Sequence, residues 1–263
     1  MSAAGPLAGL GVALTRPRPQ CEALAAALEA EGARVFIFPA LDIVPVALPD
    51  ASREALRSLP RAALAIFVSA NAAEHGLAAA EHGLAAAGSG GPWPPSVTVA
   101  GIGEATAAAL RRAGIANVVA PAAGFDSESL LACPELQSVG GKRILIFRGV
   151  GGREHLRATL ESRGASVAYV ECYRRERPAT DPAPLRAALA HGEIGAVHAM
   201  SAETVDNFLA LAGQGANWSG VALVVPHPAI ARHASAAAFG RTVVAGPGTR
   251  GLVDALLSLR RTA

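Results

Sequence analysis

Aromatic side chains are scarce in this chain, at 4% of its 263 residues, and charged residues make up 17%. Hydrophobic residues reach 51%, a balance that excludes intrinsic disorder. No uninterrupted apolar run of roughly 18 residues occurs, so we expect no membrane span. Residues 1–10 lack the basic segment and apolar stretch of a secretory signal. These absences favour a soluble cytoplasmic protein of one or two domains.

Cysteine and lysine are also rare. Cys21, Cys133 and Cys172 lie far apart without a C-x-x-C pair, a pattern typical of reduced structural thiols. Lys142 is the only lysine, so an anion site would use arginine side chains or backbone N–H groups. The net charge is +2 and no block of five like charges occurs, so we expect neither a nucleic-acid arm nor a basic membrane patch.

Short apolar runs alternate with alanine-rich helical stretches along the whole chain. Apolar strands that are each followed by a helix are typical of parallel strands buried on both faces, so the sequence predicts an α/β fold. The predicted strands cover residues 11–15, 34–38, 64–68, 97–100, 144–147, 197–200, 221–225 and 243–245. The predicted helices cover residues 19–31 and begin near Asn71, Glu104, Arg153, Ala202, Pro228 and Thr249.

Two strand-like segments interrupt this alternation. Residues 40–49 contain two prolines and follow no helix, and residues 167–177 are longer than a buried parallel strand needs to be. If both run between lobes, residues 1–39 and 177–263 form lobe 1 and residues 47–168 form lobe 2. Residues 40–46 and 169–176 are then the connector strands.

A seven-residue repeat, AEHGLAA, covers residues 73–79 and again 80–86. Seven residues make about two helical turns, so His75 and His82 share one side of a helix. A metal pair is conceivable, but this spacing is too wide for one ion. We favour a duplication on a solvent-facing helix, followed by a surface loop at residues 88–95.

The junctions between strands and helices carry glycines, arginines and small hydroxyl groups. Ligands of open α/β sheets bind beyond the carboxyl ends of the strands, where helix N-termini offer N–H groups to carboxylates or phosphates. The alternative to ligand binding, for each junction taken singly, is an ordinary turn or helix cap. The candidate binding residues are Arg16, Ser69, Asn71, Gly103, Thr106, Arg148, Gly149, Gly152, Arg153, Ser201, Thr204 and His227.

Most of the familiar catalytic motifs are missing. The stretch from Gly101 to Thr106 resembles a dinucleotide fingerprint but lacks its third glycine, and RGVGGRE at residues 148–154 lacks the Lys-Ser/Thr of a P-loop. There is no G-x-S-x-G, no H-E-x-x-H and no His/Cys cluster with metal spacing. A nucleotide, nicotinamide or metal enzyme is therefore disfavoured.

An ordered set of motifs carries a family resemblance from about Leu14 to Gly246. The opening is LTRPRPQCEALAAALEAEGARVFIFPALDIVP, and FVSANAAEHG, GIGEATAAALRRAG and DSESLLACPEL follow. The most specific stretch is RILIFRGVGGREHL followed by RGASVAYVECYRR, and SAETVDNF and PHPAIARHA come after it. Each motif is weak alone, but the ordered set resembles the uroporphyrinogen-III synthase family. The AEHGLAA duplication departs from the family pattern in one helix.

The resemblance implies two similar flavodoxin-like α/β lobes with parallel sheets, joined by a two-stranded connector. The implied reaction is a lyase reaction that closes hydroxymethylbilane into uroporphyrinogen III, inverting ring D and losing water. It needs no cofactor and no metal. Tyr173 is the candidate acid for the leaving hydroxyl, and the junction residues would bind substrate carboxylates.

The resemblance also implies a cytoplasmic monomer of tetrapyrrole biosynthesis. Its partner would be the linear tetrapyrrole, with transient contact to upstream or downstream enzymes, and neither nucleic acid nor membrane. Two alternatives stay open: a non-catalytic tetrapyrrole-binding or regulatory protein of the same fold, and a two-lobed sugar or amino-acid binding protein.

Overall fold

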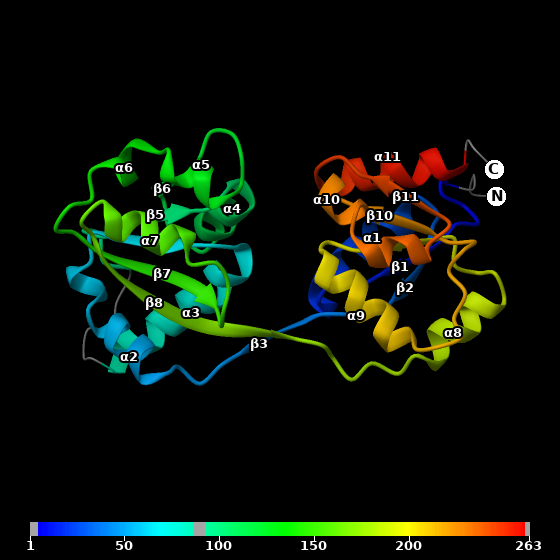
Figure 1. The fold of residues 1–263 in the computed structure, drawn as a ribbon, viewed down its shortest axis with the longest axis horizontal. Coiled ribbons are helices and arrows are strands. Elements are labelled where there is room, and N and C mark those ends of the chain that lie inside the picture. The colour runs from blue at the N-terminus through cyan, green and yellow to red at the C-terminus, as the bar shows by residue number, and fades with distance from the viewer. Residues whose placement is uncertain (1–4, 87–92, 261–263) are drawn as a thin grey trace. The chain divides into compact units, whose positions relative to one another are not determined.

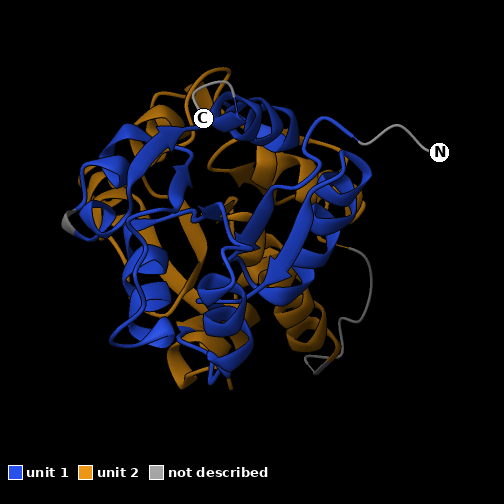
Figure 2. Cartoon of the chain, turned by 90° about the vertical axis from the view of Figure 1, so that its right-hand side faces the viewer, with its two compact units in different colours: residues 1–42, 176–263 blue, residues 43–175 orange. Residues whose placement is uncertain are grey.

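The computed structural model describes residues 5–86 and 93–260, which form two compact units (Figures 1 and 2). Unit 1 comprises Met1–Asp42 and Glu176–Ala263, and unit 2 comprises Ile43–Arg175. The chain therefore leaves unit 1 once and returns to it once. None of the helices in the described ranges is long and apolar enough to cross a membrane.

Unit 1 has a five-stranded sheet in the order β11-β10-β9-β1-β2, and every pair in it is parallel. Counted along the chain within the unit, this is the order 2-1-3-4-5 of flavodoxin-like folds. The order changes direction between β1 and β9. The strands are β1 (Gly11–Leu14), β2 (Arg34–Ile37), β9 (Ala196–His198), β10 (Ala222–Val225) and β11 (Arg241–Val244).

Helices cover both faces of the unit 1 sheet because alternate strand residues point to opposite sides. Val12 and Leu14 pack with α1 and α11, whereas Ala13 packs with α8 and α9. Gly32, with φ of 91°, ends α1 in the left-handed conformation common after a helix. The helices are α1 (Arg18–Ala30), α8 (Ala183–Ala190), α9 (Ala202–Ala212), α10 (Pro228–Ala231) and α11 (Gly248–Arg260), with a 3₁₀ turn at Ala234–Ala238.

Unit 2 has a six-stranded sheet in the order β3-β8-β7-β4-β5-β6. Its strands from β4 to β8 are parallel and, counted from β4, follow the order 3-2-1-4-5. The direction changes between β4 and β7. The strands are β3 (Asp42–Pro45), β4 (Leu64–Phe67), β5 (Thr98–Gly101), β6 (Val118–Val119), β7 (Arg143–Gly149) and β8 (Ser166–Glu176).

The two faces of the unit 2 sheet have separate cores. Phe67 and Phe147 pack with α2, α3 and α4, whereas Ile66 and Ile146 pack with α5, α6 and α7. The helices are α2 (Asp50–Arg57), α3 (Ala70–Ala86), α4 (Glu104–Arg112), α5 (Ser127–Leu131), α6 (Pro134–Gln137) and α7 (His155–Ser162), with a 3₁₀ turn at Leu59–Arg61.

The predicted alternation of parallel strands and helices is confirmed in both units. The flavodoxin-like strand order holds for unit 1, whereas unit 2 has the order given above. The helix predicted from Arg153 begins at His155, after Gly151 and Gly152 take φ values of 75° and 111°. The helix predicted from Pro228 has only four residues.

Strands β3 and β8 are neighbours at one edge of the unit 2 sheet, and the backbone N–H of Val46 donates to the carbonyl of Cys172 at 3.4 Å. The boundaries between the units, at residues 42–43 and 175–176, fall within these two strands. The role of residues 40–46 and 169–176 as connector strands, and the lobe limits set around them, remain predictions.

Helix α3 contains the duplicated AEHGLAA segment. The prediction of a solvent-facing helix is wrong for one of its faces, which is buried. Ala72, Ala73 and Ala80 are buried, and both repeated glycines face neighbouring side chains. A Cβ on Gly76 would lie 2.7 Å from Cδ1 of Phe147. A shift of seven residues keeps the same helix face inward, so both copies present their glycine to the core. Most of the loop predicted at residues 88–95 lies outside the described residues.

The two repeated glycines provide a matched test of this packing. A Cβ on Gly83 would lie 3.3 Å from Cδ1 of Leu56, the flexible end of that side chain, so we expect Gly83→Ala to stabilise the protein by up to about 1 kcal/mol through helix propensity. In Gly76→Ala the added Cβ meets two stacked rings, and overpacking of about 1–3 kcal/mol should outweigh that gain. Urea unfolding of both variants measures the difference, and equal stability would contradict it.

Candidate functional site

In each unit the strand order changes direction at a point where polar residues follow the strands. Ligands of open α/β sheets bind outside the carboxyl ends of strands at such points. In unit 1 the point lies between β1, which leads to Arg16, and β9, which leads to Ser201. In unit 2 it lies between β4, which leads to Ser69, and β7, which ends at Gly149.

Tyr173, Ser69 and Gly149 meet at the unit 2 position. The Tyr173 hydroxyl shares a hydrogen bond with the Ser69 hydroxyl at 3.1 Å, and Ser69 Oγ also accepts the backbone N–H of Ala72 at 2.9 Å. Ser69 therefore caps α3 and holds the phenol at the same time. A Cβ on Gly149 would lie 2.8 Å from Cε2 of Tyr173, so only glycine admits the ring here.

The Tyr173 side chain is buried at 3% exposure, and its ring lies 5.7 Å from the ring of His75. The predicted catalytic tyrosine is thus held from three sides. Its hydrogen-bond partner Ser69 is 104 residues away in the chain, a contact that the sequence alone did not reveal.

Arg148 is buried, and its guanidinium is bound by other residues of unit 2. Its Nη1 donates to Glu154 at 2.9 Å, its Nε donates to the Gly149 carbonyl at 3.2 Å, and its guanidinium lies 4.1 Å from the centre of the Tyr169 ring. Glu171 lies 3.8 Å from Nε. The guanidinium predicted to bind substrate carboxylates already has a carboxylate, so its binding role stays a prediction.

The contacts among Arg148, Glu154 and Tyr169 shift the pKa values of Glu154 and Tyr169. Hydrogen bonds from Tyr169 and Arg148 lower the pKa of Glu154. Burial, followed by its bond to Glu154, raises the pKa of Tyr169 to about 12. Gly152 lies against this cluster, because a Cβ there would meet Nη2 of Arg148 at 3.4 Å. Tyr169 and Glu154 were missed by the sequence analysis.

Gly103 and Thr106 lie beside a loop with an exposed aromatic ring. A Cβ on Gly103 would lie 2.9 Å from Cβ of Phe125, a residue that is 76% exposed and that the sequence analysis did not single out. Thr106 is buried and its backbone N–H donates to the Gly103 carbonyl at 3.1 Å. Hydrogen bonds from Ser129 lower the pKa of Asp126.

Three further candidate residues lie near these elements. The charge of Arg153 also acts on Asp126, which places the end of the β7–α7 connection near this loop. Asn71 is half-buried in the first turn of α3, and Gly149 ends β7. Their contact with a ligand stays a prediction.

In unit 1, Arg16 lies beside His198 and Met200. Its Nη2 donates to the Met200 sulfur at 3.1 Å, and the Thr15 hydroxyl donates to the His198 carbonyl at 2.8 Å, which joins the ends of β1 and β9. Within the described residues, Nε of Arg16 and Nδ1 of His198 are buried without a hydrogen-bond partner. Burial lowers the pKa of Arg16, and burial followed by the Arg16 charge lowers the pKa of His198 to about 3.

Of the other three unit 1 candidates, Ser201 and His227 act as helix caps and Thr204 lies in the first turn of α9. Ser201 Oγ accepts the backbone N–H of Thr204 at 3.1 Å and lies 2.8 Å from its hydroxyl, and Thr204 is buried. His227 Nδ1 accepts the backbone N–H of Ala229 at 3.0 Å, and its side chain is exposed. The capping alternative is therefore confirmed for Ser69, Ser201 and His227, and any ligand contact of these residues stays a prediction.

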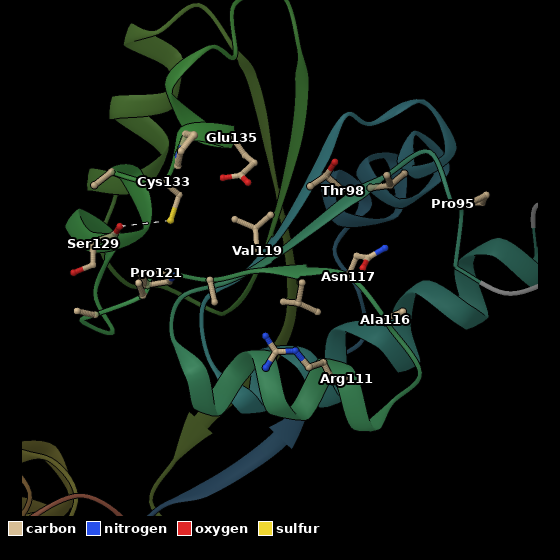
Figure 3. Close-up of a pocket in the computed structure, with 17 residues that line it drawn as sticks. Pro95, Thr98, Arg111, Ala116, Asn117, Val119, Pro121, Ser129, Cys133 and Glu135 are labelled. Atoms are coloured by element: carbon tan, nitrogen blue, oxygen red, sulfur yellow. Dashed lines mark hydrogen bonds between the residues drawn. The ribbon is translucent and has the colours of Figure 1, made fainter.

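A cavity of about 1060 Å³ lies elsewhere in unit 2, along β6 (Figure 3). Arg111, Cys133 and Glu135 line it together with apolar residues such as Val119. None of its described lining residues belongs to the predicted site. This cavity lies at the edge of the sheet, whereas the polar candidate groups lie at the strand ends; we place the candidate site at the strand ends because catalytic groups must converge. No group of three His, Cys, Asp or Glu that could hold a metal occurs in residues 5–86 or 93–260.

These features define a protein of two parallel α/β units with polar groups gathered where each strand order reverses. The chain belongs to the uroporphyrinogen-III synthase family, since the family model described as uroporphyrinogen-III synthase HemD matches residues 22–254. Most of both units lies inside that match.

Curated relatives carry the same family name. The uroporphyrinogen-III synthase of Salmonella typhimurium is 37% identical over 166 residues, which is 63% of this chain and 65% of that protein. The chain thus spans slightly less than two thirds of that relative. The uroporphyrinogen-III synthase of Synechococcus elongatus is 33% identical over 218 residues, which is 81% of this chain and 80% of that protein.

Solved structures show the same fold at low identity. A mutant uroporphyrinogen III synthase from Thermus thermophilus covers 97% of this chain with a TM-score of 0.59 and 20% identity. A uroporphyrinogen-III synthetase from Helicobacter pylori covers 95% of this chain with a TM-score of 0.56 and 14% identity. In both cases the match covers 100% of the solved chain.

His198 predicts a pH dependence of stability. In the folded protein it remains neutral until the pH approaches 3, whereas in the unfolded chain it takes up a proton near its ordinary pKa of 6.5. Proton uptake by the unfolded chain alone lowers the stability as the pH falls between these values, by up to about 1.4 kcal/mol per pH unit. Urea unfolding at pH 7, 6 and 5 should show this slope, and His198→Gln should reduce it. An unchanged slope in the variant would contradict the assignment.

Proposed function

We propose that the chain is a uroporphyrinogen-III synthase, which closes hydroxymethylbilane into uroporphyrinogen III with inversion of ring D and loss of one water. One observation carries the proposal: the Tyr173 phenol lies 3.1 Å from the Ser69 hydroxyl at the strand reversal of unit 2. Membership of the family over residues 22–254 supports it.

The reaction begins when the bond between carbon and the terminal hydroxyl breaks, and a donated proton lets the hydroxyl leave as water. The azafulvene that remains is attacked by the substituted carbon of ring D, which gives a spiro intermediate. This intermediate fragments and closes again with the ring inverted. The pyrrole carbon loses a proton in the final closure, which balances the proton donated at the start.

We assign the donation of that first proton to Tyr173. Ser69 fixes the direction of the phenol, and Gly149 leaves space for the ring at the strand end. Because the bilane is itself reactive, we assign most of the rate to holding it in a folded shape, and only part to proton transfer.

The carboxylates of the substrate require donors around the site. The first turn of α3, with 17 residues, and of α9, with 11, present backbone N–H groups beside Ser69 and Ser201. Arg16 and Arg153 add guanidinium groups, which bind carboxylates with charge-assisted hydrogen bonds.

We also propose that the protein acts in the cytoplasm as a monomer, without cofactor or metal, on a linear tetrapyrrole and in transient contact with neighbouring pathway enzymes. Cys21, Cys133 and Cys172 are free, which supports a reducing compartment. Dialysis against a strong chelator should leave the synthase activity intact. Loss of activity that Zn²⁺ or Mg²⁺ restores would refute cofactor independence.

The central experiment is incubation of the purified protein with fresh hydroxymethylbilane, followed by separation of the product isomers. Predominant type III product supports the proposal. Tight binding of the bilane with only the unrearranged isomer, as in the absence of protein, would instead indicate a non-catalytic tetrapyrrole-binding protein.

The chain's two tyrosines supply a matched pair for the acid assignment. Tyr173→Phe removes the hydroxyl at Ser69 and should lower kcat by about 10²-fold or more with little change in KM. Tyr169→Phe, on the same strand, removes the hydroxyl bonded to Glu154 at 2.7 Å and should stay within a few-fold of the parent rate. Full turnover and pure type III product from Tyr173→Phe would show that Tyr173 is structural.

A further inference from the structure

Arg16 and Arg148, the two arginines at the strand reversals, differ in what their guanidinium groups contact. Arg148 donates to Glu154 and to a backbone carbonyl, and Glu171 lies near it. In the described part of the chain, no carboxylate pairs with Arg16. Its charge is therefore uncompensated in unit 1.

The acceptor that Arg16 does have is a poor one. Its Nη2 donates to the sulfur of Met200 at 3.1 Å, and a thioether is a weak acceptor. The Nε of Arg16 is buried without a partner in the described structure. A carboxylate that reached this guanidinium could accept two N–H groups, where the sulfur accepts one.

His198 is a buried neighbour of Arg16 that carries no negative charge. Its side chain is 3% exposed, and its Nδ1 has no partner among the described residues. Because the ring stays neutral at ordinary pH, it neither repels nor satisfies the guanidinium. Met200, by contrast, is 39% exposed, so the side chain that accepts the Arg16 hydrogen bond faces solvent in part.

We propose that Arg16 and Met200 form a carboxylate subsite in which the thioether occupies the guanidinium until a ligand carboxylate replaces it. The inference deepens the proposed function, on which it rests: the ligand is an acetate or propionate side chain of the tetrapyrrole. The displaced Met200 side chain then lies against the adjacent pyrrole ring, since a thioether makes favourable contacts with aromatic rings.

Met200 itself provides the probe. The chain has two methionines, Met1 and Met200, so ¹³C-methyl labelling of methionine gives two resonances, and the one missing in Met200→Leu is that of Met200. Titration with uroporphyrinogen III, the proposed product, should shift this resonance in a saturable manner. Propionate should shift it in the same direction at higher concentration, and propionamide, which has no charge, should not.

Two arginine variants test whether the shift of the Met200 resonance depends on the Arg16 guanidinium. Arg16→Ala should abolish the propionate shift and raise the Kd for uroporphyrinogen III by about ten- to a hundredfold. Arg34→Ala is the matched control, because it removes an arginine of the same unit that pairs with Glu193 at the start of β2. It should leave the propionate shift and the Kd for uroporphyrinogen III unchanged.

Three outcomes would overturn the subsite: equal shifts with propionate and propionamide, a propionate shift that persists in Arg16→Ala, or product binding that leaves the Met200 resonance unmoved. Failure of the proposed function looks different. In that case propionate shifts the Met200 resonance through Arg16, but uroporphyrinogen III does not bind and hydroxymethylbilane gives no type III product.

Discussion

A parallel strand covered by helices on both faces can carry polar side chains only where it ends. Strands β4 and β10 are buried along their whole length, and the first polar side chain after β4 is that of Ser69. Parallel pairing brings such strand ends to one edge of each sheet. The position of Ser69 beside Gly149 and Tyr173 is therefore a consequence of strand pairing, and the proposed chemistry depends on it.

The arginines at the two strand reversals differ in their partners. In unit 2 the buried Arg148 is paired with Glu154, and Glu171 lies near it, so its charge is already compensated. In unit 1 the Arg16 guanidinium has no carboxylate partner in the described residues. Donation of a proton needs fixed geometry, whereas recognition of a carboxylate needs a positive charge that is not already paired.

The strands and most helices could be predicted because short apolar runs and helical stretches differ in local pattern, which needs no long-range information. Strand order could not, since unit 1 and unit 2 differ in order despite similar local patterns. His198 and Met200 were assigned to a strand at residues 197–200, but β9 ends at His198, so the residue that meets Arg16 lies past the strand end. The partners of Arg148 could not be found either, because burial and cation–π contact with Tyr169 arise only on folding.

Gly149 has a structural role that its selection from the sequence did not include. Sequence analysis selected it as a glycine of a binding loop, whose value would be an accessible backbone N–H. In the structure it ends β7, and the Tyr173 ring occupies the space that any Cβ would fill, with Cζ only 2.9 Å away. A side chain there would displace the ring and with it the hydroxyl bonded to Ser69. Its missing side chain, rather than any group it offers to a ligand, sets the position of the phenol.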